Sequence, residues 1–91
     1  MLTALKGGPR VVGTKETLRV IKEGRAYQIF LADDVDKSIK DKIYKAAETS
    51  NINVNIVDSK LKLGRACGID VAAASAALLK KIEGGEVYAN N

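Results

Sequence analysis

The stretch that decides the fold is AYQIFLADDVDKSIKDKIYKAAET, residues 26–49. It opens with a nearly all-apolar run, Ala26–Ala32, which is typical of a central strand buried on both faces. After an acidic break, apolar side chains recur at helical spacing over residues 35–47, the clearest periodicity in the chain. A buried strand followed by an amphipathic helix predicts an α/β fold.

The same alternation extends upstream of this stretch. Arg10–Val12 predicts a brief strand, and Thr14 is a candidate N-cap for a helix that ends near Gly24. Leu18 and Ile21 give that helix an inward face, with Thr17 as a further candidate for it. A strand and a helix therefore precede the central strand.

Downstream, residues 52–57 alternate like a strand, and Ser59 is a candidate N-cap for a short helix over residues 60–67. Residues 72–82 allow two interpretations, because their alanines favour a helix whereas small residues also suit a strand beneath a covering helix. Residues 83–91 are expected to form a loose tail. The order of elements predicts an α/β sandwich in one domain, residues 1–91.

Composition excludes several kinds of chemistry. The 91 residues include no histidine and one cysteine, so a histidine-based catalytic triad, an internal disulfide and a zinc cluster are all excluded. Cys67 is expected to be a small core residue in a protein of the reducing cytoplasm. We expect no signal peptide and no membrane span.

The net charge of +4 is uneven along the chain, since both ends are basic and the middle is acidic. Such a distribution can be an ordinary solvated face. It can also favour an anionic partner, for which nucleic acid is the commonest candidate.

Two motifs resemble ligand loops imperfectly. Gly8 and Gly13 have the spacing of a phosphate-binding P-loop, but Thr14 and Lys15 stand in the reverse of the required order. Residues 33–36 are rich in aspartate, but the glycine and glutamate that a calcium loop needs are missing. We expect these aspartates to end a strand and to complement the dipole of the next helix.

The segment Gly13-Thr14-Lys15-Glu16 can be read as an ordinary helix start. A helix N-terminus also presents free N–H groups to phosphate oxygens. Glu16 could accept hydrogen bonds from guanine, Lys15 could donate to base edges, and Arg19 would lie over a nucleic-acid backbone.

The segment Leu63-Gly64-Arg65-Ala66-Cys67-Gly68-Ile69 leads into an apolar loop at residues 69–71. Its plain interpretation is a helix, a glycine C-cap and the approach to a strand. Exposed aliphatic side chains in a loop can also pack against an extruded base, as in sequence-specific RNA readers.

Taken together, these two segments and Leu31-Ala32-Asp33-Asp34-Val35-Asp36 resemble the ribosomal L7Ae family, part of the L30e-like superfamily of kink-turn RNA-binding proteins. The resemblance covers about residues 10–79. It implies a three-layer α/β/α sandwich around a mixed four-stranded sheet, and it makes residues 73–79 a strand.

The resemblance also implies a function. Family members bind a sharply bent RNA internal loop, the kink-turn, at sheared G·A pairs. By this resemblance Lys15 and Glu16 would face the guanines, and residues 69–71 would cover the extruded nucleotide. The RNA-binding residues that it implies are Gly13, Thr14, Lys15, Glu16, Arg19, Asp36, Lys60, Ile69, Asp70 and Val71.

The chain departs from the family pattern at two of these positions. Many members carry Asn where this chain has Lys15, and lysine keeps donors but loses the acceptor. Some members carry Arg where this chain has Val71. The helical extension typical of longer relatives is also missing after Ile82.

The sequence therefore predicts a cytoplasmic, monomeric RNA-binding protein rather than an enzyme, with no cofactor and no metal. Its expected partner is structured RNA that contains a kink-turn, with ribosomal RNA as one candidate. Two alternatives stay open, a protein-interaction module on the same fold and a nucleotide-binding domain.

Overall fold

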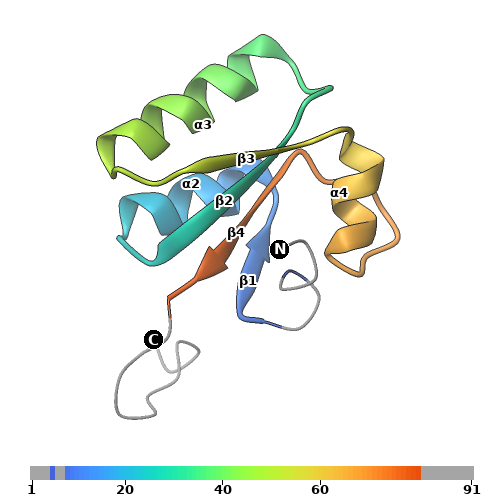
Figure 1. The fold of residues 1–91 in the computed structure, drawn as a ribbon, viewed down its shortest axis with the longest axis horizontal. Coiled ribbons are helices and arrows are strands. Elements are labelled where there is room, and N and C mark those ends of the chain that lie inside the picture. Colours follow the sequence, from blue (N-terminus) through green and yellow to red (C-terminus); the bar gives the residue numbers. More distant parts are fainter. Residues whose placement is uncertain (1–4, 6–7, 81–91) are drawn as a thin grey trace.

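Strands and helices alternate along the chain, as the sequence predicts (Figure 1). The computed structural model describes Leu5 and residues 8–80, so the expected tail at residues 83–91 lies outside the described part. The elements are β1 (Arg10–Val12), α2 (Thr14–Lys22), β2 (Ala26–Ala32), α3 (Lys37–Thr49), β3 (Val54–Val57), α4 (Lys60–Ala66) and β4 (Ser75–Leu79).

The four strands form one mixed sheet in the order β1-β4-β2-β3. Strand β4 is antiparallel to both of its neighbours, whereas β2 and β3 are parallel and are joined through α3. The register between β2 and β4 shifts at Tyr27, whose side chain is exposed. This topology confirms the predicted α/β class.

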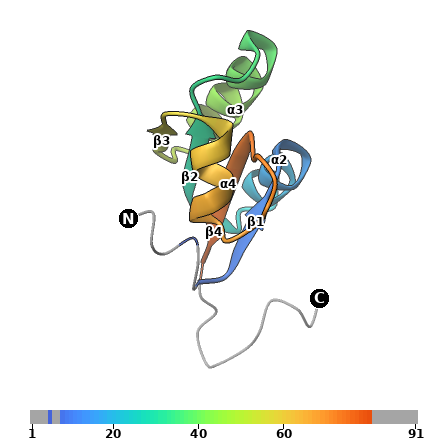
Figure 2. The same cartoon turned by 90° about the vertical axis from the view of Figure 1, so that its right-hand side faces the viewer.

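Each face of the sheet carries its own hydrophobic core. Side chains alternate along β2, so that Ile29 and Leu31 pack with α2 and α3, whereas Phe30 and Ala32 pack with α4. Figure 2 shows α2 and α3 on one side of the strands and α4 apart from both. The architecture is therefore the predicted three-layer sandwich.

Strand β4 answers the open question over residues 72–82 for the described part of that range, residues 72–80. Its five residues are all buried, and they pair with β1 on one side and β2 on the other. Burial on both faces overrides the helical preference of alanine, because Ala76 and Ala77 fill opposite cores. The strand begins at Ser75, two residues later than the resemblance implies.

The ends of α2 differ in detail from the prediction. Gly13, not Thr14, is the N-cap, and its φ of 106° lies in a region that favours glycine. At the other end Gly24 follows the C-cap with a φ of 73°, as expected for a helix stop. The inward face includes Val20, which the sequence analysis missed, whereas Leu18 is only half-buried.

The aspartates of residues 33–36 directly follow the end of β2, as predicted, but their relation to the helices differs from the prediction. Helix α3 begins at Lys37, and no acidic residue lies in its first turn. Asp36 is its N-cap but makes no side-chain capping bond. Asp34 instead accepts a hydrogen bond from the backbone N–H of Lys60 at 2.8 Å, so it stabilises the start of α4. There Ser59 is the N-cap, as predicted, and its hydroxyl accepts from the Lys62 N–H at 3.1 Å.

Candidate functional site

The predicted site residues gather at one edge of the sheet. Because β4 is antiparallel to β1 and β2, the C-terminal ends of these two strands lie beside the start of β4, and the C-terminal end of β3, which is parallel to β2, lies at the same end of the sheet. We call this the site edge. It brings together the start of α2, residues 33–36, the start of α4 and the connection at residues 69–74, which are far apart in sequence. Figure 1 shows these segments converging near α4.

Ser75 joins the start of α2 to the connection that precedes β4. Its carbonyl accepts a hydrogen bond from the Gly13 N–H at 2.8 Å. Its hydroxyl donates toward Thr17 at 3.2 Å and lies 3.4 Å from the hydroxyl of Thr14. Ser75 and Thr17 are both fully buried, so these hydroxyls fix the position of α2 against β4. Of the predicted residues, Thr14 therefore acts at least in part as a structural link.

The connection at residues 69–74 lies directly against α4 at Gly64. A Cβ atom on Gly64 would overlap the carbonyl oxygen of Val71. The Gly64 carbonyl also accepts from the Ile69 N–H at 3.1 Å, and the Lys60 carbonyl accepts from the Ala73 N–H at 3.0 Å. The path of this connection therefore depends on a glycine in the middle of α4.

Gly64 lies within the motif of residues 63–69, but the motif does not show its packing role. The position of this glycine in the sequence could have indicated such a role. A glycine inside a helix lowers stability by about 1 kcal/mol relative to alanine, so its presence there usually has a packing reason. Arg10 was also missed, although its guanidinium donates to the Cys67 carbonyl at 2.7 Å and so satisfies the end of α4.

The polar part of the site lies on the first turns of α2. Lys15 and Glu16 reach the surface there, and Glu16 accepts two hydrogen bonds from Arg19, at 2.6 and 3.0 Å. These bonds and the charge of Glu16 raise the pKa of the Arg19 guanidinium. Arg19 thus orients the Glu16 carboxylate, whereas Lys15 has no ion pair in the part of the chain that the structure describes.

The backbone at the start of α2 is open as well. No side chain caps the helix, and its first internal hydrogen bond runs from the Thr17 N–H to the Gly13 carbonyl at 2.9 Å. The N–H groups of residues 14–16 therefore have no hydrogen-bond partner within the helix, as is usual in the first turn. Nothing lies within 4 Å of the place where a Gly13 Cβ would be, so this surface can be approached closely.

The apolar part of the site lies on the connection at residues 69–71. Val71 is 66% exposed, the largest exposed fraction among the exposed large hydrophobic residues of the described chain. Ile69 is half-buried and packs against the core beneath α4, so the expected exposure of two aliphatic side chains is complete for Val71 and only partial for Ile69. Asp70, Asp36 and Lys60 are all exposed on the neighbouring segments.

The two loop-like motifs do not form ligand loops. Strand β1 occupies the space between Gly8 and Gly13 and pairs with β4, so the P-loop interpretation is wrong. Among the described residues, no group of three or more acidic, cysteine or histidine side chains could hold a metal ion.

Cys67 is buried in the core beneath α4, as predicted. Burial raises the pKa of its thiol above the ordinary value, which lowers its reactivity. Within residue 5 and residues 8–80, no helix combines the length and the apolar character needed to span a bilayer.

Comparison with known protein families defines the class of this protein. A family model described as "Ribosomal protein L7Ae/L30e/S12e/Gadd45 family" matches residues 1–87. The chain belongs to this family, as the resemblance of its motifs predicted.

Individual relatives agree with this assignment. The chain is 49% identical over 76 residues to an RNA-binding protein of Geobacillus sp. (strain WCH70), covering 84% of this chain and 93% of the relative. It is 46% identical to the RNA-binding protein YbxF of Geobacillus stearothermophilus, with the same coverage. Among solved structures, the Giardia lamblia 15.5kD RNA binding protein superposes with a TM-score of 0.77 at 28% identity, covering 88% of this chain and 71% of that chain.

Proposed function

We propose that the site edge binds kink-turn RNA, with the start of α2 and the connection at residues 69–71 as the two halves of one site. The polar half is Gly13, Thr14, Lys15, Glu16 and Arg19. The apolar half is Ile69, Asp70 and Val71. Lys60 and Asp36 flank the two halves on neighbouring segments.

One observation carries this proposal: two segments more than 50 residues apart in sequence are held at the same edge through Ser75. A bent RNA internal loop offers two features at once, exposed base edges and an unstacked nucleotide. The charged start of a helix suits base edges, and an exposed aliphatic side chain suits the unstacked base. Relatives named as RNA-binding proteins give this arrangement its biological context.

The roles within the polar half follow from the contacts. The carboxylate of Glu16 can accept from the N1–H and N2–H₂ groups of guanine while Arg19 holds it in position. Lys15 supplies a mobile donor for guanine O6 and N7 or for a phosphate. The N–H groups in the first turn of α2 that lack a partner within the helix suit phosphate oxygens, because the helix dipole adds partial positive charge there.

Binding would act by selecting one RNA shape. A kink-turn samples bent and extended forms, and a protein that contacts only the bent form shifts the population toward it. The phosphate contacts make the affinity fall as salt rises. No step of this function requires catalysis or a cofactor, and one copy of the chain supplies both halves of the site.

The test is a titration of the full chain with a kink-turn RNA and with a duplex of equal length, at a range of salt concentrations. We expect tight binding to the kink-turn and weak, strongly salt-dependent binding to the duplex. Equal affinity for the two RNAs would contradict the proposal.

The natural target is proposed to be a kink-turn in ribosomal RNA or another cytoplasmic structured RNA. Crosslinking in cells followed by RNA sequencing identifies it. Recovery of ribosomal RNA kink-turns supports a ribosomal role, whereas a crosslinked RNA population without kink-turns would contradict the proposed specificity.

A further inference from the structure

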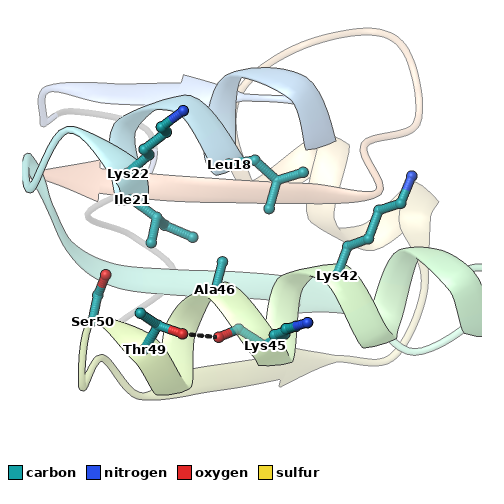
Figure 3. Close-up of a pocket in the computed structure, with 8 residues that line it drawn as sticks. All are labelled: Leu18, Ile21, Lys22, Lys42, Lys45, Ala46, Thr49 and Ser50. Atoms are coloured by element: carbon teal, nitrogen blue, oxygen red, sulfur yellow. Dashed lines mark hydrogen bonds between the residues drawn. The ribbon is translucent and has the colours of Figure 1, made fainter.

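A groove on the helical face has no part in the proposed RNA site. It runs between α2 and α3 and has a volume of about 430 Å³. Figure 3 shows Leu18 and Ile21 of α2 facing Ala46 of α3 across it. Leu18 and Ala46 are half-buried and Ile21 is buried, so the floor of the groove is apolar and recessed.

Three lysines surround this apolar floor. Lys22 comes from α2, and Lys42 and Lys45 come from α3. None of the three takes part in an ion pair within residue 5 and residues 8–80. The other lysines of α3 differ, since Lys37 pairs with Asp41 at 2.9 Å and Lys40 pairs with Asp33 at 3.2 Å.

The pattern within α3 sets apart its two groove-lining lysines. Outside the groove, the lysines Lys37 and Lys40 of α3 pair with acidic residues. Where α3 lines the groove, Lys42 and Lys45 lie one turn apart, Lys22 of α2 lines the same groove, and no acidic residue does. Like charges one turn apart repel one another and slightly destabilise the helix. An acidic partner that fills the groove would reduce this repulsion.

The groove begins about one turn into each helix and extends away from the site edge. Helix α2 starts at the site edge and ends near Lys22, and α3 leaves the same edge and ends at Thr49. The groove lines the later turns of both helices and includes Ser50, beyond the end of α3. A partner seated there would leave Glu16 and Val71 free.

We propose that this groove binds an acidic amphipathic helix of a protein partner. Apolar side chains one turn apart would enter between Leu18, Ile21 and Ala46, and flanking carboxylates would pair with the three lysines. An RNA backbone fits less well, because phosphates gain nothing from an apolar floor. The protein would thus hold an RNA at one edge and a protein segment on one face.

The experiment uses two synthetic helical peptides of about 15 residues. Both carry leucine at helical spacing, and one carries glutamate at the flanking positions where the other carries lysine. We expect the full chain to bind the acidic peptide at least about tenfold more tightly than the basic peptide, with affinity that falls as salt rises. Amide resonances of α2 and α3 should shift.

A charge swap provides the sharpest control. The triple variant Lys22→Glu, Lys42→Glu and Lys45→Glu should lose the acidic peptide and gain the basic one, which also shows that it is folded. The matched variant Lys37→Glu reverses an exposed lysine of α3 outside the groove and should bind like the original chain.

Three results would overturn the proposal. The first is binding that does not depend on the charge of the groove, seen either as equal affinity for the two peptides or as a loss of acidic-peptide binding in Lys37→Glu equal to that in the triple variant. The second is displacement of the acidic peptide by duplex RNA at lower concentration than by unlabelled peptide, which would assign the groove to phosphates. The third is self-association that disappears in the triple variant, which would assign it to a second copy.

Discussion

The two halves of the proposed RNA site are built in opposite ways. The polar half consists of exposed side chains on α2, where Glu16 and Arg19 hold one another at the surface. The apolar half is a connection pressed against α4, where Gly64 leaves no space for a side chain beneath Val71. Changes to the exposed side chains of Lys15, Glu16 and Arg19 should therefore alter binding alone, whereas changes in the support of the apolar half should alter binding and stability together.

The largest effect is expected from Gly64→Ala. An alanine inside a helix would normally stabilise it by up to about 1 kcal/mol, but here its Cβ must displace the backbone of Val71. We expect a net loss of about 1–3 kcal/mol in the free energy of unfolding, measured by denaturant titration, because overpacking forces a backbone shift. Kink-turn affinity should fall at least about tenfold, since the backbone of the whole connection moves and carries Asp70 and Ile69 with Val71.

The matched control is Ala66→Gly on the same helix. It lowers helix propensity and removes a partly buried methyl group, at a cost of about 1–2 kcal/mol, and it adds no atom that could displace the Val71 connection. Its RNA affinity should stay within about twofold. If both variants lose affinity equally, the loss follows from destabilised α4 rather than from the position of the connection.

Next in size is Glu16→Ala, which should weaken kink-turn binding by about 1–3 kcal/mol, the cost of losing a base-edge contact. Stability should change by less than about 0.5 kcal/mol, because the ion pair with Arg19 is half exposed. Calorimetric titration and thermal unfolding measure the two quantities.

Glu23→Ala is the control for charge and position. Glu23 also lies beside Arg19 and lies at the far end of α2. Its removal should leave kink-turn affinity unchanged or slightly improved, since one negative charge is lost. A larger loss in Glu23→Ala than in Glu16→Ala would place the RNA elsewhere on the helix.

A smaller effect is expected from Ser75→Ala, which removes the hydroxyl between the two halves. Thr17 would lose its buried partner at 3.2 Å, at a cost of about 1 kcal/mol in the free energy of unfolding. The backbone bond from Gly13 to Ser75 remains, so kink-turn affinity should fall only a few-fold. An unchanged stability would show that the hydroxyl is not a structural link.

The smallest effect is expected from Val71→Ala. The side chain is mostly exposed, so unfolding should change by less than about 0.5 kcal/mol. Binding should weaken by less than about 1 kcal/mol, since two methyl groups are lost from a contact with one base. If Val71→Ala instead lowers stability and keeps full kink-turn affinity, Val71 is not part of the RNA site. Gly64 then has only a structural role.

The sequence revealed the polar half better than the apolar half, for physical reasons. Charged residues at a helix start can be placed from helical periodicity alone, which located Lys15, Glu16 and Arg19 correctly on α2. The exposure of Ile69 and Val71 depends on how the connection packs against α4. That contact involves backbone atoms, so no side-chain pattern announces it.

The same distinction applies to the fold. Strand β2 was predicted with its bounds, because a continuous apolar run suits a strand buried on both faces. Strand β4 needed the family resemblance, since its alanines favour a helix and only its neighbours on both sides make it a strand. The role of Asp34 at the start of α4 is a contact between segments 26 residues apart in sequence, which local rules do not address.

The most direct test of the central claim is an amide chemical-shift map of the isotope-labelled chain during titration with a kink-turn RNA. The account predicts that the largest shifts fall on both halves of the site edge together, at residues 13–16 and 69–75, with small shifts along the groove between α2 and α3. Shifts confined to one half, or centred on the groove lysines, would contradict it.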